Sequence, residues 1–102
     1  MDNYISKIQY ITIITSTKNK NKIISLISEK GGRGINSAYC KGSVSKSFLV
    51  QAFGIEGEEK KVLITCLMKG ENAAETIQIL KNEFGFGKAN TGIAFTIPVE
   101  GL

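Results

Sequence analysis

The apolar residues fall into four short runs typical of strands and two longer stretches with a helical period. Residues 8–15 and 61–68 are rich in β-branched residues at odd and even positions alike. This pattern predicts two strands with apolar groups on both faces; the first is expected to be central in its sheet and the second to be buried on both faces. Residues 35–41 and 93–99 alternate between apolar and smaller or polar residues, which predicts two further strands.

Two segments between these strands have the spacing of amphipathic helices. The first covers residues 18–30, and Gly31 and Gly32 are expected to end it. The second is predicted to begin at Asn72, with Glu75 completing a capping box, and to end at Gly85. The residues expected to face the core are Ile23, Ile24, Leu26 and Ile27 in the first helix and Ala73, Ile77, Leu80 and Phe84 in the second.

The predicted order is strand, helix, strand, strand, helix, strand, which is typical of the ferredoxin-like split βαβ fold, an α+β class. We expect a single domain spanning residues 1–102, with a four-stranded antiparallel sheet and two helices on one face. Pro98 cannot donate a backbone hydrogen bond and suits the end of an edge strand. The other sheet face would expose apolar residues, so we expect a closed homo-oligomer.

Composition argues against catalysis. The 102 residues include no histidine, and Asp2 is the only aspartate, so a Ser-His-Asp triad or a histidine-based metal site cannot be built. We therefore expect no catalytic and no metal-binding residues. Cys40 and Cys66 are far apart in the chain and are each expected to be a buried free thiol.

The net charge is +4, but the lysines are spread along the chain. The densest group, Lys18, Lys20 and Lys22, is separated by asparagines and not by aromatic residues, so we expect it to solvate a helix start and not to bind nucleic acid. No run of eighteen apolar residues and no signal-peptide pattern is present, from which we expect a cytoplasmic protein without direct membrane insertion.

A glycine-rich segment with one lysine, residues 85–92, leads directly into the last predicted strand. Backbone N–H groups and Lys88 could hold an anion at this strand entrance. Alternatively, Gly85 and Gly87 cap the helix, Gly92 turns the chain, and Lys88 is only solvated. The glycine spacing matches neither the P-loop nor the dinucleotide-binding pattern.

Two segments, Lys41-Gly42 and residues 87–95 followed by Thr96-Ile97-Pro98-Val99, resemble the PII family of nitrogen-regulatory signalling proteins, especially its shorter PII-like members. The resemblance implies a homotrimer of ferredoxin-like subunits with an adenine nucleotide in the cleft between neighbours. One subunit would contribute its B-loop, which corresponds here to the segment from Gly87 to Gly92. The other subunit would contribute the base of its T-loop. The ligand-binding residues that the resemblance implies are Asn36, Gly42, Lys46, Gly87, Lys88, Asn90 and Gly92.

The sequence departs from the PII pattern where that family binds phosphate. Ile93 replaces the second B-loop lysine, Ser45-Lys46 replaces an Arg-Gln pair, and the chain reaches Leu102 without the family's two later arginines. Each missing cation removes a charge-assisted contact. We therefore expect weak binding of triphosphates and easier binding of a smaller or less charged anion.

The segment that corresponds to the T-loop, residues 43–59, contains no tyrosine and includes an apolar stretch readable as two helical turns. Its Phe48 and Phe53 are expected either to be buried or to dock on a partner. The resemblance thus implies a trimeric regulator of an enzyme or transporter in nitrogen or carbon metabolism, which senses an adenine nucleotide or another small anionic ligand. The alternative is a structural or interaction trimer with a vestigial pocket.

Overall fold

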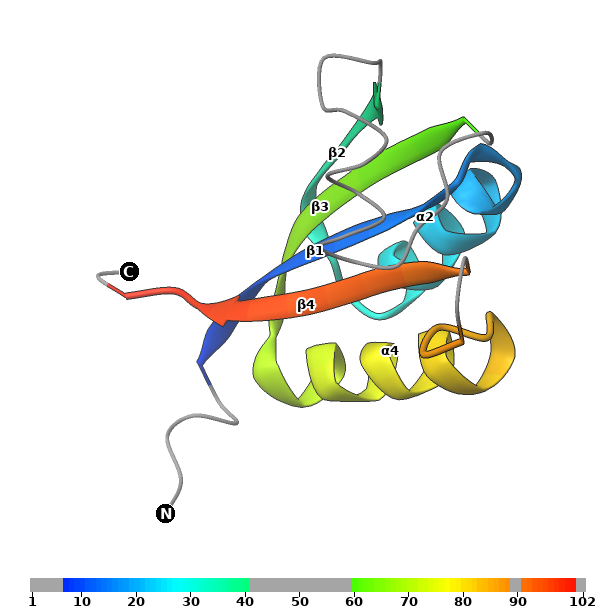
Figure 1. The fold of residues 1–102 in the computed structure, drawn as a ribbon. Coiled ribbons are helices and arrows are strands. Elements are labelled where there is room, and N and C mark those ends of the chain that lie inside the picture. Colours follow the sequence, from blue (N-terminus) through cyan, green and yellow to red (C-terminus); the bar gives the residue numbers. More distant parts are fainter. Residues whose placement is uncertain (1–6, 41–59, 89–90, 101–102) are drawn as a thin grey trace.

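The computed structural model describes residues 7–40, 60–88 and 91–100, and its elements follow the predicted order (Figure 1). One short 3-10 turn precedes the first helix. The elements are β1 (Ile8–Ser16), η1 (Thr17–Asn19), α2 (Lys20–Glu29), β2 (Arg33–Cys40), β3 (Lys61–Lys69), α4 (Gly70–Glu83) and β4 (Gly92–Pro98). The predicted ferredoxin-like α+β fold is confirmed.

The four strands form one antiparallel sheet in the order β2-β3-β1-β4. β1 pairs with β3 on one side and β4 on the other, which confirms its predicted central place. β4 is an edge strand and ends at Pro98, a place where the missing N–H group is tolerated. β2 forms the other edge.

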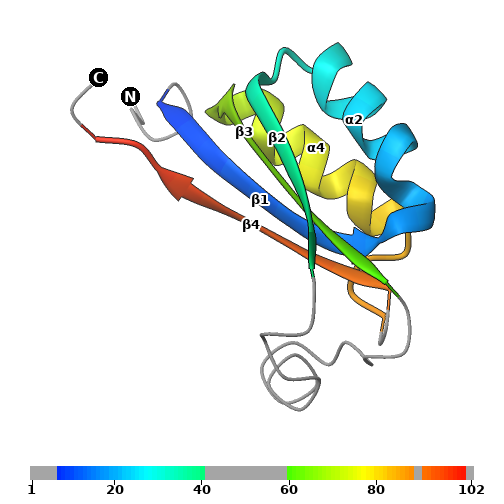
Figure 2. The same ribbon diagram turned by 90° about the horizontal axis from the view of Figure 1, so that it is seen from above.

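The two helices cover one face of the sheet, and Figure 2 shows α2 and α4 together on that side. The side chains between helices and sheet form the core, which consists of Ile11, Ile13, Ile23, Ile27, Val62, Ile64, Cys66, Met68, Ala73, Leu80 and Phe86. On the opposite face the strand register places Tyr10 beside Leu67 and Ile97. We call this the open face of the sheet.

The open face is only partly covered in the single chain. The prediction that β3 is buried on both faces is therefore wrong for the single chain. Leu63 and Leu67 are half-buried, while Val62 and Ile64 on the helix side are fully buried. The alternation arises because successive side chains of a strand point to opposite faces and the helices reach only one of them.

The predicted start of the second helix is wrong by two residues, and Asn72 does not cap it. α4 begins at Gly70, and the Asn72 side chain instead donates a hydrogen bond to the Lys30 carbonyl oxygen at 3.0 Å. Glu75 forms an ion pair with the Lys30 ammonium. Both residues therefore tie the end of α2 to α4, because a free carbonyl at a helix end is itself a strong acceptor.

The buried stripe of α4 differs in part from the predicted one. Ala73 and Leu80 are buried as expected, whereas Ile77 and Phe84 are only half-buried and Thr76 is fully buried. The Thr76 hydroxyl donates to the Asn72 carbonyl oxygen at 2.8 Å. A threonine is tolerated here because its polar atom is satisfied within its own helix.

The two cysteines lie in different environments. Cys66 is buried against the helices, as expected, but Cys40 is exposed, because β2 is an edge strand. Burial raises the pKa of the Cys66 thiol to about 11 and also raises the pKa of Cys40. A raised pKa lowers the fraction of reactive thiolate at neutral pH.

We expect one fast-reacting thiol per native chain. An aromatic disulfide reagent at about pH 8 should modify Cys40 readily and Cys66 only after denaturant is added, because the Cys66 thiol is both inaccessible and protonated. Cys40→Ser should abolish the fast phase. Two thiols that react at equal rates in the native protein would contradict the burial of Cys66.

Candidate functional site

The glycine-rich loop begins where α4 ends. The backbone N–H groups of Phe84 and Phe86 both donate to the Leu80 carbonyl oxygen at 3.2 Å. Gly85 between them has a φ of 72°, in the left-handed region that favours glycine. The bond from Phe86 to Leu80 reaches back six positions, one more than the closing bond of a Schellman motif, so the helix ends in a wider turn. This arrangement turns the chain back over the last turn of α4.

A tight turn follows the helix end. The Lys88 N–H donates to the Gly85 carbonyl oxygen at 3.0 Å, and Gly87, third in this turn, has a φ of 102° as a type II turn requires. Thr91 Oγ1 lies 2.7 Å from the Gly85 carbonyl oxygen and 2.8 Å from that of Lys88. The Thr91 hydroxyl therefore holds the two ends of the turn at a fixed separation.

The loop is also tied to the far end of β1. The buried Thr15 hydroxyl donates to the Thr91 carbonyl oxygen at 3.1 Å and accepts from Asn19 Nδ2 at 3.1 Å. Asn19 belongs to η1, between β1 and α2. The position of the loop is thus set by α4 on one side and by the β1–α2 connection on the other.

Phe86 anchors the loop in the core. Its side chain is 7% exposed, and its ring lies directly against the backbone of Gly92. A Cβ atom at Gly92 would lie 2.5 Å from the ring, so only glycine fits at the start of β4. Packing explains this glycine, and the expected ligand contact of Gly92 remains a prediction.

A cavity of about 380 Å³ lies between the loop, α4 and β4. Most of its lining is apolar, and two lysines supply the charge. The lining residues are Ile77, Leu80, Lys81, Phe86, Gly87, Lys88, Gly92, Ile93 and Ala94. This volume is in the range of sites for small ligands, which typically begin at about 300 Å³.

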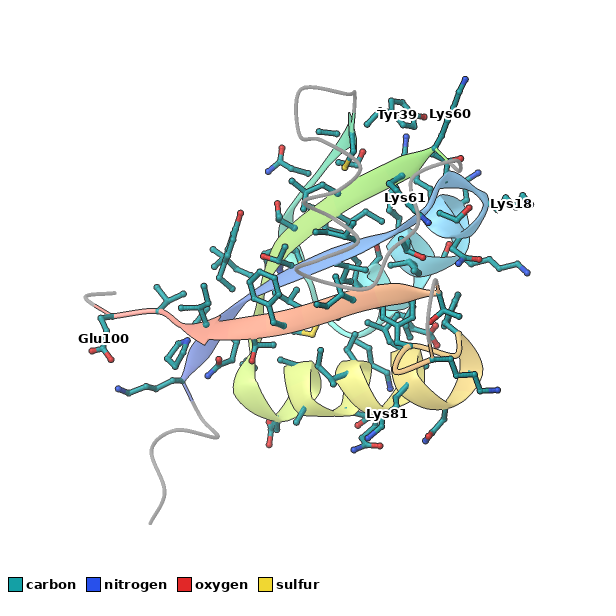
Figure 3. The ribbon with its side chains drawn as sticks, viewed as in Figure 1. Lys18, Tyr39, Lys60, Lys61, Lys81 and Glu100 are labelled. Carbon is teal, nitrogen blue, oxygen red and sulfur yellow. The ribbon has the colours of Figure 1, made fainter. Side chains whose placement is uncertain are left out.

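Sequence reasoning missed Lys81. Figure 3 shows it on the C-terminal half of α4, the part of the helix that the loop follows. Lys81 lies one helical turn after Ile77, which also lines the cavity. Helical spacing could have placed Ile77 and Lys81 together, but only the path of the loop shows that they face the glycine-rich loop.

Lysines also gather at the end of the sheet where β1 finishes and β3 begins. Lys18, Lys60 and Lys61 lie there together with Tyr39 (Figure 3). Lys20 Nζ donates to the Tyr39 hydroxyl at 3.1 Å and lies 4.8 Å from the centre of its ring. Because β1 pairs with β4, the glycine-rich loop of residues 85–92, called the glycine loop below, enters the sheet at this same lysine-rich end.

Within one chain the structure brings together Gly87, Lys88 and Gly92, but not Asn36. Asn36 lies on β2, with β3 and β1 between it and β4, and its side chain donates to the Gly34 carbonyl oxygen at 3.2 Å. The remaining expected site residues lie outside the described residues: Gly42, Lys46, Phe48, Phe53 and Asn90.

The part of the chain that the structure describes contains no group of three or more Cys, Asp or Glu residues placed to hold a metal ion. None of its helices is long and apolar enough to cross a bilayer.

No protein-family model matches the sequence, and no curated protein matches it. Solved structures do share its fold. A protein of Thermus thermophilus described as a PII-like signalling protein has a TM-score of 0.66 at 16% identity, covering 90% of this chain and 85% of that one.

CPII, a PII-like protein of Thiomonas intermedia, shares the fold to a similar degree. Its complex with ADP, AMP and acetate has a TM-score of 0.66 at 15% identity, over 90% of this chain and 85% of CPII. A complex of the nitrogen regulatory PII-like protein CPII with ADP, AMP and bicarbonate has a TM-score of 0.59 at 15% identity, covering 90% of this chain and 91% of CPII. The chain therefore has the PII-like fold that its sequence predicts.

We expect Gly92→Ala to lower the free energy of unfolding by about 2 kcal/mol, because the added Cβ must displace the buried Phe86 ring. Urea denaturation measures this change. In a Phe86→Leu background the smaller side chain leaves room, so the cost of Gly92→Ala should fall by about 1 kcal/mol. An equal cost in both backgrounds would contradict the steric role of Gly92.

Proposed function

We propose that this chain is a PII-like regulatory protein that binds a small anionic or nucleotide metabolite at the glycine loop and reports its presence to a partner protein. The observation that supports this most is the fixed loop with the Lys88 ammonium beside a cavity of about 380 Å³. The proposal gives the protein a regulatory and not a catalytic role, exercised in the cytoplasm on an enzyme or transporter.

The loop has the properties of an anion site before any ligand arrives. Its backbone from Gly85 to Lys88 is held by the bond from Phe86 to Leu80, the turn and the Thr91 hydroxyl, so binding would order little additional chain in this part of the loop. Gly87 is exposed and lacks a side chain, which lets a ligand approach its backbone. CPII, which shares the fold, binds ADP, AMP, acetate and bicarbonate. An adenine nucleotide or one of these small anions is the ligand class that we assign to the loop.

The open face of the sheet supports assembly into the proposed homotrimer. Tyr10 is 39% exposed, Phe95 40% and Ile97 51%, and the register places all three on this face. A contiguous apolar face of this kind is typical of a subunit interface. In the trimer, Asn36, Gly42 and Lys46 would approach the loop from a neighbouring subunit, and Phe48 and Phe53 would contact the regulated partner.

Lys88→Ala should weaken binding of ADP, AMP or bicarbonate by about tenfold to a hundredfold, because one charge-assisted contact is lost. Calorimetry measures the affinity. The melting temperature of the free protein should change little, since Lys88 is exposed. Lys22→Ala, which removes an exposed lysine of α2 outside the cavity, is the matched control and should bind like the wild type.

Two results would count against this assignment. Wild-type affinity in Lys88→Ala would move the site away from the loop. Failure of the wild-type protein to bind any of the three ligands would favour the alternative, a structural trimer with a vestigial pocket.

Tyr10→Glu and Ile11→Glu should act differently because they lie on opposite faces of β1. Tyr10→Glu should give a folded monomer, since an unpaired carboxylate is costly to bury in an interface. Ile11→Glu should unfold the chain, because Ile11 is fully buried in the core. Light scattering and circular dichroism measure both outcomes. A wild-type protein that is monomeric at micromolar concentration would refute the trimer.

A further inference from the structure

The cavity contains a second lysine, Lys81, for which the resemblance to PII proteins assigns no role. We propose that Lys81 binds the anionic group of the ligand together with Lys88, while the apolar wall of the cavity binds the rest of the same molecule. The site would then take an anion attached to an apolar or aromatic body, in preference to a bare inorganic anion. This inference rests on the proposed function of the glycine loop.

The position of Lys81 places its side chain against the loop backbone. A Cβ atom built on Gly87 would lie 4.0 Å from Lys81 Cγ, so the aliphatic part of Lys81 passes beside Gly87. Lys88 is the next residue in the loop. The Lys81 and Lys88 side chains therefore start near the same exposed glycine, one from the helix and one from the turn.

Both charges are available to a ligand. Among the described residues, neither the Lys81 nor the Lys88 ammonium has an ion-pair or hydrogen-bond partner. By contrast, Lys30 pairs with Glu75, and Lys7 with Glu100 at 3.2 Å. Two unpaired cations beside the same backbone segment repel each other weakly, and an anion between them would remove that repulsion.

Lys81 also has a purely structural explanation, which makes a different prediction. It lies in the last turn of α4, where a cation interacts favourably with the helix dipole. That role would contribute slightly to stability and nothing to ligand affinity. The two roles can therefore be separated by measuring affinity and melting temperature on the same variant.

The wall of the cavity indicates what the anion is attached to. Ile77, Ile93 and Ala94 are half-buried and expose apolar surface to the cavity, and Leu80 and Phe86 are buried behind them. A cavity of about 380 Å³ is far larger than a bare phosphate or bicarbonate needs. Such an ion would leave water against the apolar wall, whereas an attached apolar or planar group would displace that water favourably.

Calorimetry with three probes tests the inference: AMP has both parts, inorganic phosphate has only the anion, and adenosine has only the body. AMP should bind the wild type at least about tenfold more tightly than either fragment. Lys81→Gln should weaken AMP binding by about fivefold to fiftyfold and adenosine binding by less than about twofold, because only the charge is removed. Lys81→Arg should keep AMP affinity within about threefold. Lys22→Gln is the matched control and should change neither.

The outcomes separate this inference from the proposed function. AMP binding that depends on Lys88 but is unaffected by Lys81→Gln would overturn the role of Lys81 and leave the loop site in place. Phosphate that binds as tightly as AMP would overturn the role of the apolar wall. Absence of saturable AMP binding to the wild type, or AMP binding independent of both lysines, would overturn the inference together with the nucleotide site.

Discussion

The contact between the Phe86 ring and the backbone of Gly92 is the constraint on which the candidate site depends. The loop is short, and its single large apolar side chain is buried between α4 and β4. Moving the loop outward would expose this ring, at a cost of about 2 kcal/mol or more. The burial of Phe86 therefore fixes Gly87 and Lys88, the next two residues, on the surface beside the cavity. A glycine at position 92 is the sequence feature that permits this packing.

Hydrogen bonds hold the loop in place in addition to the packing of Phe86. Thr15 is fully buried, and its hydroxyl is satisfied from both sides by Thr91 and Asn19. A buried hydroxyl with partners on two segments resists displacement of either one, since breaking a bond would leave a polar group unsatisfied. Gln9, also on the helix face of β1, is buried without a partner among the described residues for either side-chain atom. The contrast shows that the hydrogen bonds of β1 side chains are concentrated at the loop end of the sheet.

Most of the fold could be predicted because it depends on periodicity. Runs of β-branched residues identified β1 and β3, and alternation identified β2 and β4. The helical stripe identified α2 and α4, and glycines with positive φ marked both helix ends. The errors have a common cause in long-range contacts. Asn72 looks like a local cap, but the end of α2 offers it a stronger acceptor. Cys40 looks like a core residue, but its exposure follows from the order of strands.

The candidate site was predictable only in part, for the same physical reason. Glycine and lysine spacing identified Gly87 and Lys88, because turn chemistry is local. Lys81 joins them through the path of the chain after α4, which depends on where Phe86 is buried, and no local pattern records that. Asn36 is on the opposite edge of the sheet, so its expected role needs a second chain, whose position a single sequence cannot give.

β4 links the candidate site to the open face of the sheet. Its first residues, from Gly92 to Ala94, line the cavity, and Phe95 and Ile97 lie on the face proposed to be buried in the trimer. β4 pairs with β1 from Gly92 to Pro98, so both ends of β4 are held by one ladder of backbone hydrogen bonds. A neighbour that packs on the open face would fix β4, and with it one wall of the cavity. Assembly and ligand binding would then depend on the same strand, which gives a physical route by which either one influences the other.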